Sequence, residues 1–127
     1  AMRTPVHQAI IVHAALLLAT STAVAQGTAS DAPWPLAGQQ GLMRFVIVPA
    51  ERASDRAAYQ AQIQRLCEPD RSCFLNFYTN SSGAPLAVPL PDAIDREATA
   101  VFRRSTKQAA ESFRWSCRLQ QPEPNCF

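Results

Sequence analysis

The sequence predicts one small α+β domain, in which a three-stranded mixed sheet carries two helices on one face, in the order β-α-β-β-α. Three observations support this fold class. Residues 43–80 pass from an apolar run through an amphipathic stretch to an aromatic run. Residues 92–118 contain neither proline nor glycine, which favours a long helix. The chain has only 127 residues and four cysteines, so we expect a single domain stapled by disulfides.

Residues 1–25 have the pattern of a secretory signal peptide. An arginine near the start precedes an apolar run over residues 9–18, and small residues end at Ala25, which predicts cleavage before Gln26. The alternative is a retained membrane helix over residues 9–25, although this stretch is shorter than the roughly 20 apolar residues of a spanning helix. We therefore expect a periplasmic or secreted protein, with an inner-membrane-anchored protein as the alternative.

Residues 26–41 are expected to form an extended lead-in before the domain, which we place at residues 42–127. Glycine, proline, serine and glutamine dominate this stretch, which is typical of irregular structure. It also contains Trp34 between two prolines. Because large aromatic side chains are usually buried, we expect Trp34 to pack onto the domain.

Residues 43–49 predict the first strand, because they form an apolar β-branched run that ends at a proline. A helix follows from a cap at Ser54, with Tyr59 and Ile63 on its buried face. Residues 73–80 predict the second strand. Since a strand, helix and strand in succession normally form a right-handed crossover, these two strands should lie parallel.

Residues 86–90 alternate between larger and smaller side chains, which predicts a third strand that prolines confine to an edge of the sheet. The long helix over residues 92–118 then begins with Asp92 as its cap and packs its apolar side on the sheet. With both helices on one face, the other face needs cover from the lead-in around Trp34 or from another protein.

The long helix would carry five cations within about 60° of one another on its outer side. They are Arg96, Arg103, Lys107, Arg114 and Arg118. Such a basic stripe would attract another protein or an anionic surface, and it carries no signal for a specific nucleic acid. The alternative is an ordinary polar helix face, partly neutralised by Glu111.

Both histidines, His7 and His13, lie in the signal segment. The rest of the chain therefore lacks the usual general base and the commonest ligand of transition metals. We expect no catalytic residue, no cofactor and no metal site. A secreted enzyme that uses carboxylates with serine, threonine or tyrosine is the alternative.

The four cysteines are predicted to form disulfides, because an even number is typical of small exported domains. They are Cys67, Cys73, Cys117 and Cys126. Their spacing favours local pairing, Cys67 with Cys73 and Cys117 with Cys126, out of three possible arrangements. The spacing matches neither the usual zinc knuckles nor a C-x-x-C redox pair.

Four short segments resemble small exported proteobacterial proteins of unassigned function. They are FVIVP at 45–49, CFLNFYT at 73–79, PLPDA at 89–93 and FRWSC at 113–117. The resemblance covers most of residues 43–118 and implies export and the β-α-β-β-α order, but no activity. We expect a periplasmic or secreted binding or protein-interaction module, which could form a homo-oligomer. The alternative is a membrane-tethered accessory subunit of a larger complex.

Overall fold

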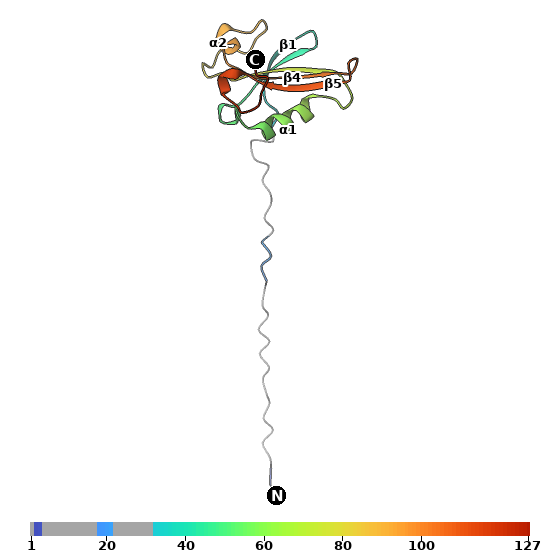
Figure 1. Ribbon diagram of the computed structural model, residues 1–127. Coiled ribbons are helices and arrows are strands. Elements are labelled where there is room, and N and C mark those ends of the chain that lie inside the picture. Colours follow the sequence, from blue (N-terminus) through green and yellow to red (C-terminus); the bar gives the residue numbers. More distant parts are fainter. Residues whose placement is uncertain (1, 4–17, 22–31) are drawn as a thin grey trace.

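The computed structural model describes residues 2–3, 18–21 and 32–127. Most of the predicted signal segment, and the first part of the predicted lead-in, lie outside these residues. In the described residues, no helix has the length and apolar character needed to cross a membrane. Residues 32–127 fold into a sheet that lies between helix α1 and helix α2 (Figure 1).

The sheet has five strands, which follow one another across the sheet in chain order. They are β1 (Leu36–Gln40), β2 (Met43–Ile47), β3 (Cys73–Tyr78), β4 (Ala98–Ser105) and β5 (Ala110–Trp115). Strands β2 and β3 are parallel, and the other neighbouring pairs are antiparallel. The sheet is mixed as expected, but the prediction of three strands is wrong.

The β2-α1-β3 unit has the predicted arrangement. Helix α1 (Arg56–Leu66) connects the two parallel strands and buries Tyr59, Gln62 and Ile63 against the sheet. Its cap is Asp55, one residue after the expected Ser54, and the Asp55 carboxylate accepts a hydrogen bond from the Ala58 N–H at 3.2 Å. A short 3₁₀ turn (Ala50–Arg52) joins β2 to this cap.

Strand β1 lies inside the segment that we expected to be an irregular lead-in. Gly41 and Leu42 form the two-residue turn to β2, and Gly41 has a φ of 58°, which glycine adopts without strain. Gly38 lets a later loop approach closely, since a Cβ at this position would overlap Val88. The lead-in is therefore partly a strand of the sheet.

Residues 92–118 do not form one long helix. Helix α2 is a single turn (Asp92–Asp95), and β4 and β5 form a hairpin that is followed by a 3₁₀ turn (Cys117–Leu119). The hairpin turn places Ala109 at a φ of 46°, a conformation in which alanine is uncommon. No glycine or proline marks this turn in the sequence, and the stretch therefore resembles a helix.

Residues 86–90 are not a strand either. Together with α2, they belong to what we call the covering segment, residues 80–97. This segment lies on the side of the sheet opposite α1, so the two helices cover opposite faces rather than one face (Figure 1). We call the face that contacts α1 the inner face, and the other the outer face.

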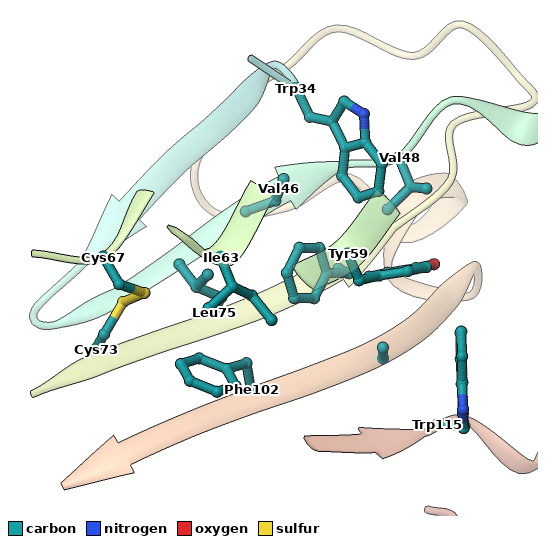
Figure 2. Packing of buried hydrophobic residues seen from close by; sticks show 12 residues of the cluster. Trp34, Val46, Val48, Tyr59, Ile63, Cys67, Cys73, Leu75, Phe102 and Trp115 are labelled. Carbon is teal, nitrogen blue, oxygen red and sulfur yellow. A yellow bond between two sulfur atoms is a disulfide. The ribbon is translucent and has the colours of Figure 1, made fainter. Parts of the chain in front are cut away.

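The inner face holds the larger core, centred on Tyr59, which is fully buried. The rings of Trp34, Phe77, Phe113 and Trp115 surround it edge-on, with centroids 5.0–5.5 Å from the Tyr59 ring. Figure 2 shows Tyr59 reaching from α1 towards the strands, with Trp34 and Trp115 on different sides of it. Edge-to-face packing of this kind stabilises a core beyond simple burial.

Trp34 is held in this core by a buried glutamine. The Gln62 side chain accepts a hydrogen bond from the backbone N–H of Trp34 and donates one to the Ala32 carbonyl oxygen, both at 2.9 Å. Trp34 is only 4% exposed, which confirms that it packs onto the domain.

The outer face has a smaller core over β1, β2 and the end of β3. Its buried residues are Ala37, Phe45, Tyr78 and Ile94. Side chains of the covering segment, including Val88 and Leu90, pack against it. The covering segment does not extend this core to the rest of β4 and β5.

Candidate functional site

Both disulfides have the local pairing that the spacing favours, Cys67 with Cys73 and Cys117 with Cys126. The first is buried in the inner core, whereas the second lies at the surface and fixes the C-terminal tail beside β5. Two disulfides in one small domain indicate that the protein folds in an oxidising compartment. In the described part of the chain, no cysteine remains free.

The five cations predicted to form a basic stripe are dispersed, because the helix that would align them does not exist. Arg96 follows α2, Lys107 lies in the β4–β5 turn, and Arg118 lies in the last 3₁₀ turn. Arg103 on β4 and Arg114 on β5 come together on the outer face, where they are diagonal neighbours on adjacent strands. The stripe is thus replaced by a pair of arginines.

Three of these arginines donate to backbone carbonyl oxygens. Arg114 donates to the carbonyls of Asn125 and Cys126, at 2.8 and 3.2 Å, and so holds the tail. Arg118 donates to the carbonyls of Glu97 and Ala98, both at 2.8 Å. Arg103 is the third, and it donates to the carbonyls of Leu75 and Phe102. The described residues contain four ion pairs, and none of these three arginines takes part in them.

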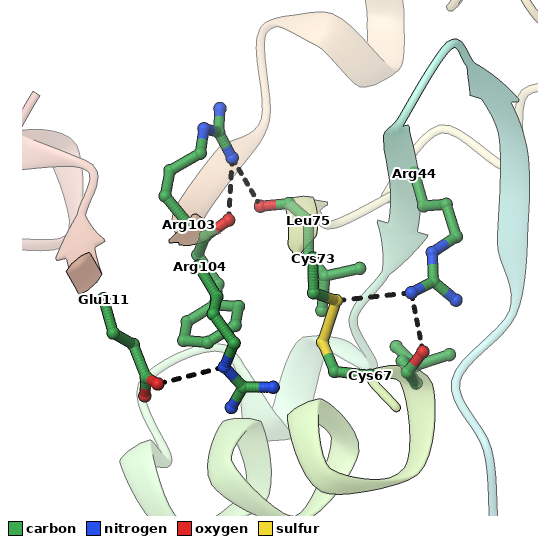
Figure 3. The surroundings of a disulfide bond; sticks show 9 residues. Arg44, Cys67, Cys73, Leu75, Arg103, Arg104 and Glu111 are labelled. Atoms are coloured by element: carbon green, nitrogen blue, oxygen red, sulfur yellow. Dashed lines mark hydrogen bonds and ion pairs between the residues drawn. A yellow bond between two sulfur atoms is a disulfide. The ribbon is translucent and has the colours of Figure 1, made fainter. Parts of the chain in front are cut away.

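The guanidinium of Arg103 is fixed on the outer face. Its Nη1 donates to the carbonyl oxygens of Phe102 at 2.9 Å and Leu75 at 3.1 Å, and its Nη2 donates to Asn76 Oδ1 at 2.8 Å. Figure 3 shows Arg103 and Arg104 leaving β4 on opposite sides, with α1 on the side of Arg104. Partial burial lowers the pKa of Arg103, and no carboxylate of the described residues pairs with it.

Asn76 links Arg103 to a tyrosine under the covering segment. While its Oδ1 accepts from Arg103, its amide Nδ2 donates to the Tyr78 hydroxyl at 3.3 Å. Burial raises the pKa of Tyr78, so this hydroxyl stays protonated near neutral pH. The Asn76 side chain is therefore held at both ends, and its oxygen faces Arg103.

Around Arg103, the outer face of β3, β4 and β5 is incompletely covered. We call this surface the open face, and its side chains are those of Phe74, Asn76, Val101, Arg103, Ser105, Ala110, Ser112 and Arg114. None of them belongs to either buried core. The set includes two arginines, one aromatic ring and no acidic residue, so its charge is positive.

A partly open pocket of about 290 Å³ lies on the open face beside Arg103. Its walls are formed by Phe74, Arg103, Ser105, Gln108, Ala110, Glu111 and Ser112. One cation, one aromatic ring, two hydroxyls and an amide thus surround the same hollow, together with Glu111, whose carboxylate pairs with Arg104. These groups can bind a small anionic or polar group, and none of them is a histidine.

Two larger hollows, of about 520 and 460 Å³, lie on either side of the Cys67–Cys73 loop. Arg104 lines the first and pairs with Glu111 at 3.0 Å, and Arg71 lines the second and pairs with Glu68 at 3.5 Å. Arg44, in the second, donates to the carbonyl of Leu66 and to Cys73 Sγ (Figure 3). Their charges are largely paired, so they are weaker candidates than the open face.

In residues 2–3, 18–21 and 32–127, no three histidine, cysteine, aspartate or glutamate side chains lie together as metal ligands would. No family model, curated protein or solved structure matches the chain.

Sequence reasoning missed most of the open face. It selected Arg103 and Arg114, but it placed them on a helix and did not associate them with Phe74, Asn76 and Ser112. The signal that could have found these neighbours is the alternation of side chains along a strand, which puts Phe74 and Asn76 on one side of β3. The pairing of Arg103 with Ser112 depends on the hairpin register and has no local signal.

Proposed function

We propose that this protein is a periplasmic or secreted binding module that contacts an acidic surface of a partner protein through its open face. The observation that carries the proposal is the positive charge of this face, which has two arginines and no acidic residue. The domain itself supplies no carboxylate partner for either arginine among the described residues. A partner with acidic groups would be complementary in charge.

Export is supported by two independent features. The two disulfides fit an oxidising compartment such as the periplasm or the medium. The apolar run and small residues before Gln26 fit a secretory signal. Intact mass measurement of the protein from its native organism, before and after reduction, tests export; the expected chain begins at Gln26 and has four protected thiols.

The physical character of the open face favours a protein partner. Its side chains project from three hydrogen-bonded strands, so binding requires little ordering of the backbone. Arginine and aromatic side chains are also enriched at the centres of protein interfaces. The pocket of about 290 Å³ is smaller than typical small-molecule pockets, so the strands around it suit contact with a protein surface better than the enclosure of a whole small molecule.

Site-specific photo-crosslinking in the native organism tests this function. A photoreactive amino acid replaces Ser112 on the open face, and a matched control replaces Gln60, which is exposed on α1 at the other side of the sheet. We expect one crosslinked protein from position 112 that is absent from position 60. The purified partner should then bind the wild-type domain and bind Ala110→Trp at least tenfold more weakly, because the indole blocks the face.

Two results would contradict this function. Equal crosslinking from positions 112 and 60 would show that the open face does not select a partner. Crosslinking of position 112 to a second copy of the chain would show that the face mediates self-association instead.

A further inference from the structure

We propose that the pocket beside Arg103 binds the carboxylate of an aspartate or glutamate side chain of the partner, in a two-bond contact with the guanidinium. This inference rests on the proposed function and names the group that the open face recognises. It follows from the donors that Arg103 leaves free, from the pairing of the nearby Glu111 with Arg104, and from the size and lining of the pocket.

Arg103 uses three of its five N–H donors within the domain. Nη1 donates to the Leu75 and Phe102 carbonyl oxygens, and Nη2 donates once to Asn76. The described residues provide no acceptor for Nε–H or for the second Nη2–H. A carboxylate can accept two parallel hydrogen bonds from such a pair of donors. Because the first three bonds already fix the guanidinium, little side-chain entropy is lost on binding.

One acidic residue, Glu111, lines the pocket, but its carboxylate is already paired. It lies on the side of the sheet that faces α1, where it accepts a hydrogen bond from Arg104 Nε at 3.0 Å (Figure 3). The side chains that project from the open face include no acid. An external carboxylate can therefore bind the free donors of Arg103 while Glu111 stays bonded to Arg104.

The remaining walls suit an acidic side chain. The Phe74 ring, whose centroid is 6.0 Å from the Arg103 guanidinium carbon, gives the methylene groups an apolar surface. Ser105 and Ser112 provide hydroxyls at the rim. The volume of about 290 Å³ is just below the roughly 300–1,000 Å³ of typical small-molecule pockets, so one side chain fits better than a cofactor.

The test is an NMR titration of the disulfide-intact domain with N-acetyl-glutamate amide, with N-acetyl-glutamine amide as the uncharged control ligand. We expect the Arg103 Nε–H signal to move with the first ligand and not with the second. The affinity should fall several-fold between low and physiological salt. It should fall at least tenfold in Ser112→Asp, which adds a negative charge at the rim, and remain unchanged in Gln60→Glu.

Arg103→Lys provides a second check, because it keeps the charge but loses the paired donors. We expect it to bind at least fivefold more weakly, whereas unchanged affinity would contradict the two-bond contact. The carboxylate inference would be overturned if N-acetyl-glutamate amide and N-acetyl-glutamine amide shifted the Arg103 Nε–H signal equally. It would also be overturned if the Nε–H signals of all arginines shifted equally. Inorganic phosphate binding more tightly than the glutamate ligand would also overturn it.

The outcomes separate this inference from the proposed function. If position 112 crosslinks a partner but the glutamate ligand leaves Arg103 unmoved, the binding module stands and the carboxylate contact is wrong. If the ligand binds but no partner is crosslinked, the pocket chemistry stands and the protein-binding function is wrong.

Discussion

The two faces of the sheet perform different tasks. On the inner face, α1 and aromatic side chains from β3 and β5 fill the space around Tyr59. On the outer face, the covering segment closes only the part over β1, β2 and the end of β3. The inner face therefore carries most of the stability, and the open face keeps polar groups that the fold does not need for its core.

Arg103 and Arg104 show this division within one strand. Arg104 lies on the inner face, where it pairs with Glu111 and its guanidinium carbon lies 5.4 Å from the centroid of the Phe102 ring. Arg103, one residue earlier, lies on the outer face and bonds to backbone carbonyls and Asn76. Because successive side chains of a strand point to opposite faces, a single step along the chain separates a paired arginine from one with free donors.

The largest expected difference between the faces concerns aromatic side chains. Tyr59→Ala should lower the free energy of unfolding by about 3–5 kcal/mol, because it leaves a cavity among four rings. Phe74→Ala on the open face should lower it by less than about 1 kcal/mol, since this ring is only partly buried. Urea unfolding measures both, and similar losses would show that the open face is part of the core.

The two disulfides offer the next test. Replacing Cys117 and Cys126 with alanine should cost about 2–3 kcal/mol by the chain-entropy estimate for a short loop. Replacing Cys67 and Cys73 should cost more, because these side chains are 5% and 3% exposed and also belong to the inner core. Urea unfolding under non-reducing conditions compares the two double variants, and the reverse order would contradict a stability centred on the inner face.

The parts of the fold that could be predicted have local signals. The β2-α1-β3 unit follows from an apolar strand, a capped amphipathic helix and an aromatic strand in succession. The disulfides follow from spacing. In both cases the residues that decide the structure lie within about 35 positions of one another.

The β4–β5 hairpin could not be predicted because its signals are not local. Thr106 to Ala109 turn the chain without glycine or proline, and Ala109 takes the positive φ. Phe102 and Phe113 pack in the same core as Tyr59 and Ile63 of α1, so burial against a helix that is distant in sequence decides between strand and helix. The open face includes residues of both strands of this hairpin, so it could not be predicted either.

Removing the donors of Arg103 should have a smaller effect on stability. We expect Arg103→Gln to lower the free energy of unfolding by about 1 kcal/mol, because it removes three hydrogen bonds at a half-exposed site. The same change should abolish the response to N-acetyl-glutamate amide. A loss of stability as large as that of Tyr59→Ala would mean that Arg103 serves the fold, and the division between the two faces would fail.

The smallest effect concerns the covered part of the outer face, where Glu97 ties the two ends of the covering segment together. Partial burial tends to raise the pKa of Glu97, but hydrogen bonds from Ser81 and Thr79 outweigh it and lower the pKa below the ordinary 4.5. Since the unfolded chain then binds the proton more readily, this carboxylate stabilises the fold above pH 4.5 and loses its contribution as the pH falls through the lowered pKa.

In Glu97→Gln the free energy of unfolding should therefore fall less steeply as the pH drops below 4.5, by about a few tenths of a kcal/mol, because the group is largely exposed to solvent. NMR titration of the Glu97 carboxyl supplies the direct measurement, and Thr79→Ala, which removes one donor, should raise its pKa. Titration at or above 4.5 in the wild-type protein would mean that the Ser81 and Thr79 bonds do not outweigh burial. The Glu97 carboxylate would then not stabilise the covering segment, and the remaining contacts of this segment would hold it in place.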